Sequence, residues 1–113
     1  MSISYTDVGE LRKIAITGRL DVDGTDSVAS QLVELTQAPK KGVVVDLSSL
    51  KFLASIGIRA LITAAKAVKA RGGKMVLVVD SGSTVMMSIK ATGIDQLVPI
   101  FDDDSAAEKA AIA

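Results

Sequence analysis

Short apolar segments alternate with stretches of helical periodicity along this chain, and this alternation constrains its fold more than any other feature. Residues 43–47 and 74–79 are nearly continuous apolar runs, which are typical of strands covered on both faces of a sheet. Each run precedes a stretch in which apolar side chains recur every three or four residues, as along one face of a helix. Strands that alternate with helices predict a largely parallel sheet with helices packed against it.

The N-terminal segment predicts a hairpin that makes this sheet mixed. Residues 11–18 alternate apolar and polar side chains, and residues 2–7 precede them across a tight turn that contains glycine. A short strand at 98–101 contains a proline, which favours an edge position. An acidic run then caps an Ala-rich final helix. We therefore expect a single domain over residues 1–113, of the α/β class, with a mixed β-sheet of four to five strands and about four helices packed against it.

Start and stop residues place the other helices. The first has Thr25 as the preferred N-cap, with Asp23 and Asp26 as a weaker alternative similar to a capping box, and Pro39 stops it. The second runs from about 56 to 71 and ends at a pair of glycines, and the third starts in a Ser/Thr-rich segment and ends at another glycine. The side chains expected to face the core from the first two helices are Val28, Leu32, Leu35, Ile58, Leu61, Ile62, Ala65 and Val68.

The chain contains no histidine and no cysteine. This absence removes His-based triads, His general bases, Cys nucleophiles and Cys/His zinc sites together. An enzyme would have to work with carboxylates, lysine, serine or tyrosine. We therefore expect a protein that is not an enzyme.

Charge and hydropathy restrict the partners. Thirteen basic and thirteen acidic residues cancel, whereas nucleic-acid-binding domains usually carry a basic excess. The longest apolar runs, of about five residues, are far shorter than the roughly 20 residues that a membrane span needs. The first five residues lack the basic and apolar regions of a signal peptide. We expect a cytoplasmic domain that binds no nucleic acid and makes no membrane contact by itself.

Three aspartates follow apolar segments and form one candidate site. If Asp21, Asp46 and Asp80 lay on one rim of the sheet, their oxygens could hold Mg²⁺, and a phospho-accepting aspartate would fit at position 46. No lysine follows the last strand to complete such a site. The competing interpretation is that these carboxylates bond to nearby loop amides and fix turns.

Ser55 at the start of the second helix forms the other candidate site. Its hydroxyl can serve as a plain N-cap, or it can accept a phosphate. The free N–H groups and partial positive charge of a helix N-terminus stabilise an anion. Arg59, four residues later, has the spacing to reach such a phosphate.

Apolar residues around Ser55 are consistent with a protein interface. Leu53 and Ile56 flank it outside the main helical stripe, and Met86 and Met87 follow on the next helix. Adjacent helical residues cannot both face the same core line, so one methionine is available for a protein contact or both fill the edge of the core.

These segments make the chain resemble the anti-sigma factor antagonist family, whose fold is the STAS domain. The matching pieces are Gly18-Arg19-Leu20-Asp21, Val43-Val44-Val45-Asp46-Leu47-Ser48 and Phe52-Leu53-Ala54-Ser55-Ile56-Gly57-Ile58. The resemblance covers nearly the whole chain. It implies a STAS-type sheet with helices packed against it and a regulatory binding function.

The resemblance also implies partners. A member of this family captures an anti-sigma factor that is itself a serine kinase, and thereby frees the sigma factor. The kinase would phosphorylate Ser55, a phosphatase would reverse this, and the ATP would belong to the kinase, so that the chain needs no cofactor and no metal. The residues expected to contact the partner are Asp21, Ser48, Leu53, Ala54, Ser55, Ile56, Ile58, Arg59 and Met87.

Two residues beside Ser55 differ from the family's common pattern. Ala54 stands where an aspartate is common, and Ile56 stands where a serine or threonine is common. The first turn is more apolar as a result. An alternative therefore stays open, in which the chain is a phosphorylation-independent STAS partner subunit of another complex, such as a lipid-transport or stress-sensing assembly.

Overall fold

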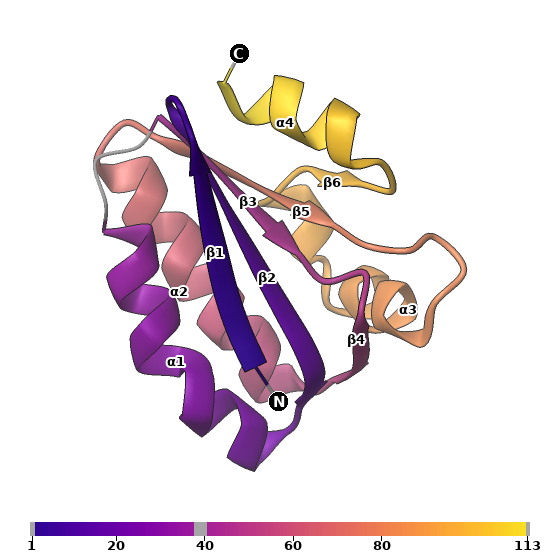
Figure 1. The fold of residues 1–113 in the computed structure, drawn as a ribbon. Coiled ribbons are helices and arrows are strands. Elements are labelled where there is room, and N and C mark those ends of the chain that lie inside the picture. The colour runs from indigo at the N-terminus through magenta and orange to yellow at the C-terminus, as the bar shows by residue number, and fades with distance from the viewer. Residues whose placement is uncertain (1, 38–40, 113) are drawn as a thin grey trace.

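A computed structural model describes residues 2–37 and 41–112 of the chain (Figure 1). The elements follow in the order β1 (Ser2–Val8), β2 (Leu11–Leu20), α1 (Val22–Thr36), β3 (Gly42–Asp46), β4 (Leu50–Leu53), α2 (Ser55–Ala70), β5 (Lys74–Val78), α3 (Thr84–Thr92), the 3₁₀ helix η1 (Ile94–Gln96), β6 (Ile100–Phe101) and α4 (Asp104–Ile112). The α/β class is confirmed, and the four helices agree with the prediction.

The sheet is mixed, as predicted, but among the described residues it has six strands rather than four or five. Its main path runs β1-β2-β3-β5-β6, with β1 antiparallel to β2 and the remaining neighbours parallel. The unexpected strand is β4. It pairs in parallel with the far end of β2, with an irregularity in the register between Gly18 and Arg19. The ten-residue β2 therefore pairs with β3 along its first half and with β4 along its second half.

Helices cover both faces of this sheet. In Figure 1, α1 and α2 lie side by side against one face, and α4 lies on the other. The larger core, which includes Ile14, Leu32, Leu61 and Leu77, lies under α1, α2 and α3. The smaller core lies under α4, where Ala107 and Ala111 face the sheet. A Cβ added to Gly42 would lie 2.5 Å from the carbonyl oxygen of Ala111, so α4 approaches the start of β3 very closely.

The predicted core stripes need small corrections. Val28 and Leu32 are buried as expected, but Thr36 continues the stripe of α1 while Leu35 is only half-buried. On α2, Ala64 is buried, and Ile62 and Ala65 lie half-exposed at the edge of the core. Both shifts follow from the rotation of the helices against the sheet, which the sequence alone leaves uncertain by about one residue.

The N-cap of α1 differs from the prediction. Asp21, in extended conformation, caps the helix, and its carboxylate accepts a hydrogen bond from the Gly24 backbone N–H at 2.9 Å. Thr25 lies inside the first turn instead, where its side chain is buried and its hydroxyl has no partner within the described chain. Pro39, predicted to stop this helix, lies outside the described residues, and α1 ends at Thr36.

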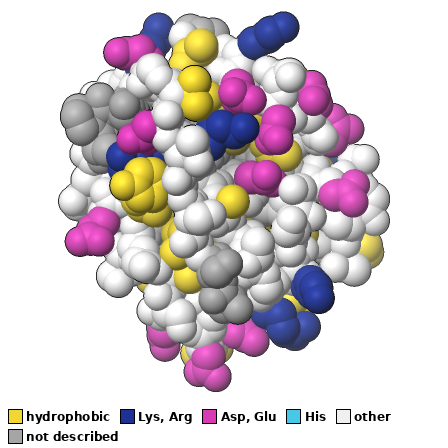
Figure 2. All heavy atoms as spheres, in the orientation of Figure 1, with side chains coloured by type: hydrophobic (Ala, Val, Ile, Leu, Met, Phe, Trp, Pro, Cys, Tyr) yellow, Lys and Arg dark blue, Asp and Glu magenta, His cyan; other side chains and the backbone are white. Residues whose placement is uncertain are grey.

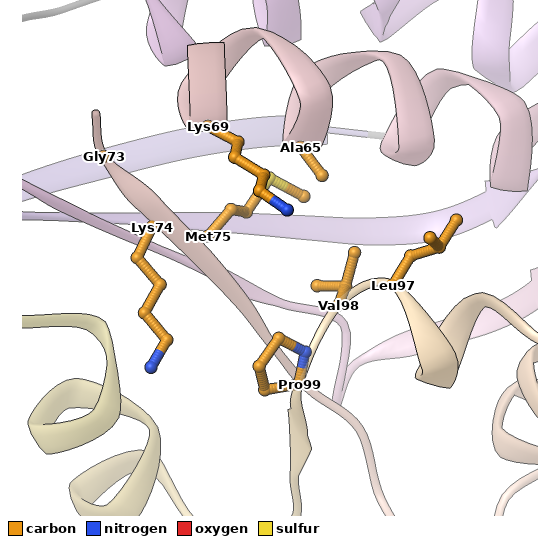
Figure 3. Close-up of a pocket in the computed structure, with 8 residues that line it drawn as sticks. All are labelled: Ala65, Lys69, Gly73, Lys74, Met75, Leu97, Val98 and Pro99. Atoms are coloured by element: carbon orange, nitrogen blue, oxygen red, sulfur yellow. The ribbon is translucent and has the colours of Figure 1, made fainter. Parts of the chain in front are cut away.

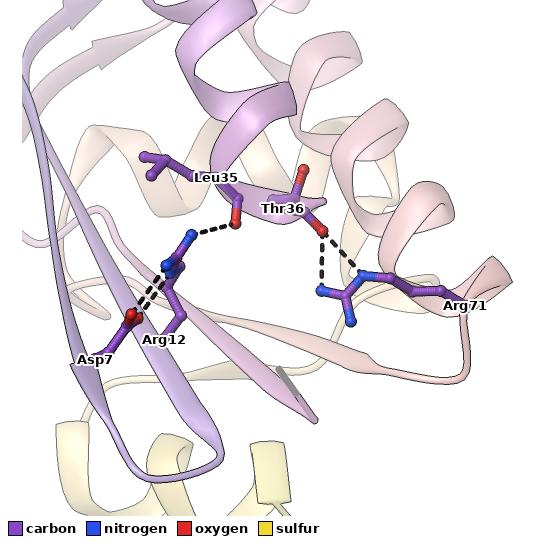
Figure 4. A network of polar contacts seen from close by, with 5 residues as sticks. All are labelled: Asp7, Arg12, Leu35, Thr36 and Arg71. Atoms are coloured by element: carbon purple, nitrogen blue, oxygen red, sulfur yellow. Dashed lines mark hydrogen bonds and ion pairs between the residues drawn. The ribbon is translucent and has the colours of Figure 1, made fainter. Parts of the chain in front are cut away.

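Two arginines from other elements close the C-terminal end of α1 (Figure 4). Arg12 of β2 donates to the Leu35 carbonyl oxygen at 3.1 Å and also forms two hydrogen bonds with Asp7. Arg71, just after α2, donates to the Thr36 carbonyl oxygen at 3.1 and 2.9 Å. The last turn of α1 contains no basic residue of its own. Side chains from β2 and from the end of α2 therefore satisfy carbonyls that a helix end leaves open.

Candidate functional site

Ser55 is the first residue of α2, and Ala54 is the N-cap. Ala54 is extended, with φ −86° and ψ 166°, and an alanine side chain cannot accept a capping hydrogen bond. The interpretation of Ser55 as a plain N-cap is therefore wrong. Ser55 is exposed, and its hydroxyl makes no hydrogen bond within the described part of the chain. Its hydroxyl is therefore accessible at a helix N-terminus whose first turn contains no acidic residue.

Backbone contacts hold this helix start against the end of β2. The Ala54 N–H donates to the Leu20 carbonyl oxygen at 2.9 Å, and the Ile58 N–H donates to the Ala54 carbonyl oxygen at 3.1 Å. A Cβ added to Gly57 would lie 2.9 Å from the Cβ of Leu20. Only glycine allows the first turn of α2 to pack this closely on β2. The site is therefore built on two rigid elements.

An arginine and an aromatic ring contact each other on the paired ends of β2 and β4, just before α2 begins. The guanidinium of Arg19 lies 4.5 Å from the ring centroid of Phe52, its neighbour in the strand register. Its Nε lies 3.7 Å from a carboxylate oxygen of Asp21, which is exposed on the surface. A solvent-exposed ion pair such as Arg19–Asp21 contributes little to stability. Both side chains are therefore available to contact a partner.

Two exposed apolar residues extend this surface. Met87 is 71% exposed on α3, which packs against β4, so of the two alternatives the one with an exposed methionine is correct. Val22, the first residue of α1, is 59% exposed and directly follows Asp21. Exposed apolar side chains around an unpartnered hydroxyl are typical of protein-contact surfaces.

Three of these residues were missed in the sequence. Arg19 and Phe52 stand in the quoted motif segments, but their neighbourhood depends on the pairing of β2 with β4, a strand that was not expected. Val22 was missed because the preferred N-cap of the first helix, Thr25, lies four residues after the observed N-cap, Asp21. The signal that was available is that Phe52 is one of only three aromatic residues in the chain.

The structure removes two residues from the predicted partner surface and separates a third. Leu53 and Ile58 are 3% and 4% exposed, because both face the core beneath the helix start. Ser48 is exposed, but it precedes β4 whereas Ser55 follows it, which puts roughly 13 Å of strand between them at about 3.3 Å per residue. The residues that the structure brings together at the helix start are Asp21, Ala54, Ser55, Ile56 and Arg59, with Ala54 and Ile56 half-exposed. Met87 is exposed on α3, which packs against β4.

The proposed three-aspartate site does not form. Asp46 lies opposite Ala15 of β2, and Asp21 comes six residues after Ala15, just beyond the end of that strand, which corresponds to roughly 20 Å. No group of three or more metal-binding side chains gathers anywhere in the described ranges. Asp21 caps α1, and Asp46 accepts a hydrogen bond from the Ser48 N–H at 2.9 Å. The turn-fixing interpretation is therefore confirmed for these two carboxylates.

Charge and hydropathy show no single dominant surface on the face that Figure 2 draws. On the face in Figure 2, acidic and basic side chains are interspersed and hydrophobic side chains lie between them. No helix within the described ranges is both long and apolar enough to span a bilayer.

Comparisons with known proteins agree with this geometry. The sequence profile of the STAS domain matches residues 3–107. A curated relative, the anti-sigma F factor antagonist of Paenibacillus polymyxa, is 27% identical over 92 residues, which are 80% of this chain and 78% of the relative. The crystal structure of an anti-sigma factor antagonist from Mycobacterium paratuberculosis is similar with a TM-score of 0.89 at 20% identity, covering 99% of this chain and 94% of that one. The Bacillus cell fate determinant SpoIIAA in its phosphorylated form has a TM-score of 0.69 at 14% identity, covering 96% and 99% of the two chains.

Proposed function

This chain belongs to the STAS domain family, and we propose that it is an anti-sigma factor antagonist whose binding is switched off at Ser55. The partner is an anti-sigma factor that is itself a serine kinase, and a phosphatase restores the binding-competent form. The observation that carries the proposal is the exposed Ser55 hydroxyl, which has no capping role at a helix start held rigidly on β2. The curated anti-sigma F factor antagonist, 27% identical, supports the partner class.

The local physics suits a switch of this kind. A phosphoserine carries about −1.5 to −2 charges at pH 7. The N–H groups of the first turn of α2 stabilise that charge by ~0.3–1 kcal/mol, so the fold tolerates it. A partner packed over Ser55 and Met87 would instead have to bury it, which costs several kcal/mol without a compensating group. A loss of ~2.7 kcal/mol already weakens binding about 100-fold.

The partner would contact the surface defined by Arg19, Asp21, Val22, Phe52, Ser55, Ile56, Arg59 and Met87. The exposed apolar members supply area, and the two arginines supply hydrogen-bond donors. Nothing in this scheme asks the chain to bind ATP or to perform a chemical step, because the kinase supplies both.

A kinase assay with binding measurements tests this proposal. The cognate anti-sigma factor is incubated with the chain and ATP, the phosphosite is mapped by mass spectrometry, and affinity is compared for Ser55→Ala and Ser55→Asp. We expect phosphate on Ser55, retained binding for Ser55→Ala and a loss of about 100-fold for Ser55→Asp. Ser48→Asp is the matched control, because it adds the same charge about 13 Å away. Phosphate at another residue, or equal affinities for the two Ser55 variants, would contradict the switch.

The apolar neighbours of Ser55 favour a second candidate, a constitutive subunit that binds its partner without phosphorylation. Ala54 and Ile56 are half-exposed beside the hydroxyl and would add to a permanent interface. In that case the chain purified from its native cell is unphosphorylated in every growth condition and co-purifies with a partner that lacks kinase activity. Reproducible, stoichiometric phosphoserine at position 55 would exclude this candidate.

A further inference from the structure

A depression with aliphatic and basic side chains lies along α2 at the end opposite Ser55 (Figure 3). Ala65 on α2 forms one wall, the segment Leu97–Pro99 forms the other, and the buried Met75 lies at the base. The cavity measures about 300 Å³ and adjoins a second one of about 160 Å³ that also includes Ile62. The two share Ala65, Lys69, Leu97 and Val98, so they form one continuous groove, called here the α2–Leu97 groove.

The groove leaves apolar surface exposed to solvent. Leu97 is 65% exposed although it follows a 3₁₀ helix and precedes the buried Val98. Ile62 and Ala65 are half-exposed on the helix that faces it. A depression with exposed aliphatic walls matches the shape that one face of an amphipathic segment fills with a large apolar side chain.

The charged residues that line this groove are all lysines. Lys66 and Lys69 stand one helical turn apart on α2, and Lys74 begins β5 at the same end. None of the three forms an ion pair with the described residues, and no carboxylate lines either cavity. In Figure 3, Lys69 extends from α2 toward Met75. Because the whole chain has a formal net charge of zero, three unpaired ammonium groups at one groove are a local excess.

We propose that the α2–Leu97 groove binds an acidic amphipathic segment of a partner protein. An apolar side chain of that segment fills the space between Ala65 and Leu97, and its Asp or Glu side chains pair with Lys66, Lys69 and Lys74. Complementary charge of this kind fixes orientation and speeds association more than it adds affinity.

This surface is separate from the one proposed for the anti-sigma factor. Ser55 and Lys69 are fourteen residues apart on one straight helix, which corresponds to roughly 20 Å. The groove also opens along its side between exposed walls, so a chain segment covers it better than a small enclosed ligand does. One protein can therefore engage partners at both ends of α2.

The test uses the full chain and a fluorescein-labelled peptide of about 16 residues with leucines spaced at i, i+3, i+4 and i+7 and glutamates between them. Binding is measured by fluorescence polarisation and by ¹H–¹⁵N NMR shifts. We expect shifts confined to the amides of residues 62–69 and 94–99. Lys66→Glu combined with Lys69→Glu should weaken binding by about tenfold, as expected when exposed ion pairs become like-charge contacts.

Lys109→Glu is the matched control, because Lys109, like Lys69, is an exposed lysine in the last turn of a helix. It should change the affinity less than twofold, and so should Ser55→Asp, which separates this proposal from the proposed function. A peptide with every glutamate replaced by glutamine should bind about tenfold more weakly. Circular dichroism confirms that each variant is folded.

Several results would overturn the proposal. These are no shifts at the groove amides at millimolar peptide, equal weakening by Lys109→Glu, or equal binding of the glutamine peptide. Shifts at the same amides that grow with protein concentration in the absence of peptide would assign the groove to a second copy of the chain. Shifts with dodecanoate but not with the peptide would assign it to a small anionic amphiphile.

Discussion

The backbone N–H of Ala54 donates a hydrogen bond to the carbonyl oxygen of Leu20, with 2.9 Å between nitrogen and oxygen. This single bond joins the start of α2 to the last residue of β2, thirty-four positions earlier in the chain. Leu20 also packs against Gly57, one turn into the helix. A chemical change at Ser55 therefore alters the surface of a fixed helix start and leaves its position unchanged.

Gly57→Ala is expected to destabilise the fold by about 1–3 kcal/mol through overpacking. The new Cβ would lie 2.9 Å from the Leu20 Cβ and from the Leu53 Cδ1. At an unhindered helix position the same change stabilises by roughly 0.5–1 kcal/mol, so the sign of the effect is diagnostic. Urea denaturation measures it. Gly82→Ala, where nothing lies within 4 Å of the added Cβ, is the control and should change stability little.

Ser55→Asp is expected to stabilise the isolated chain by ~0.3–1 kcal/mol at low ionic strength. The added carboxylate stands in a first turn that contains no acidic residue. Ser55→Asn is the control, because asparagine has nearly the same shape as aspartate but no charge. The difference between the free energies of unfolding of Ser55→Asp and Ser55→Asn isolates the electrostatic contribution. That difference should vanish near 1 M NaCl, where the Debye length falls to ~3 Å. A gain that persists in salt would contradict the helix-terminus explanation.

Arg12→Met is expected to cost about 1–3 kcal/mol. The guanidinium, only 13% exposed, donates to Asp7 at 2.7 and 2.9 Å and to the Leu35 carbonyl oxygen at 3.1 Å. We expect a cost in the lower part of this range, because water can solvate the Asp7 carboxylate when the guanidinium is removed. Arg59→Met makes the same substitution at an exposed position and should stay within about 0.5 kcal/mol of the parent. Equal losses of unfolding free energy in the two variants would contradict this prediction.

The contribution of Arg12 should not depend on pH over the neutral and mildly alkaline range. The hydrogen bond with Asp7 raises the pKa of Arg12 above its ordinary value, with burial acting in the opposite direction. A folded-state pKa above the unfolded value means that the stabilisation is fully present below the unfolded pKa and is lost only in strongly alkaline solution, as the pH rises through the folded-state pKa. The difference in unfolding free energy between parent and Arg12→Met should therefore be the same at about pH 7 and about pH 10.

Gly42→Ala is expected to loosen α4 selectively. The added Cβ would lie 2.5 Å from the carbonyl oxygen of Ala111, and backbone cannot move aside as a flexible side chain can. We expect hydrogen-exchange protection to fall at the amides of α4 while α1 keeps its protection, because the two helices pack on opposite faces. Uniform loss of protection in both helices would mean that the whole fold is weakened instead.

The sequence predicts the alternation of strands and helices correctly because each element carries its own pattern. The strand β4 was missed because Leu50–Leu53 is only four residues long and pairs with β2 rather than with a neighbour in sequence. The same pairing places Arg19 beside Phe52, so the miss of one strand also hid two site residues. Pairing between segments that are distant in sequence depends on tertiary structure, so local periodicity does not predict it.

The start of the second helix was predicted to within one residue, but the local structure around Ser55 differs in detail. Ser55 was expected to cap the helix, whereas the helix begins at Ser55 and Ala54 takes the cap position. Leu53 and Ile58 were expected to contact the partner, but both are buried, which agrees with the separate prediction that Ile58 faces the core. Helix phase decides which apolar residues near a helix start are exposed, and a shift of one residue rotates them by about 100°.

The hydrogen bonds from Arg12 and Arg71 to the C-terminal end of α1 affect how the chain folds. The carbonyls of Leu35 and Thr36 are bonded by Arg12, twenty-three residues away, and by Arg71, thirty-five residues away. An isolated helix of fifteen residues is marginal in water, so the end of α1 should fray until the hairpin and α2 have docked. Contacts this distant in sequence raise the contact order and slow folding. A fragment that ends before Arg71 should therefore show exchange-labile amides at the end of α1, even where the hairpin is already formed.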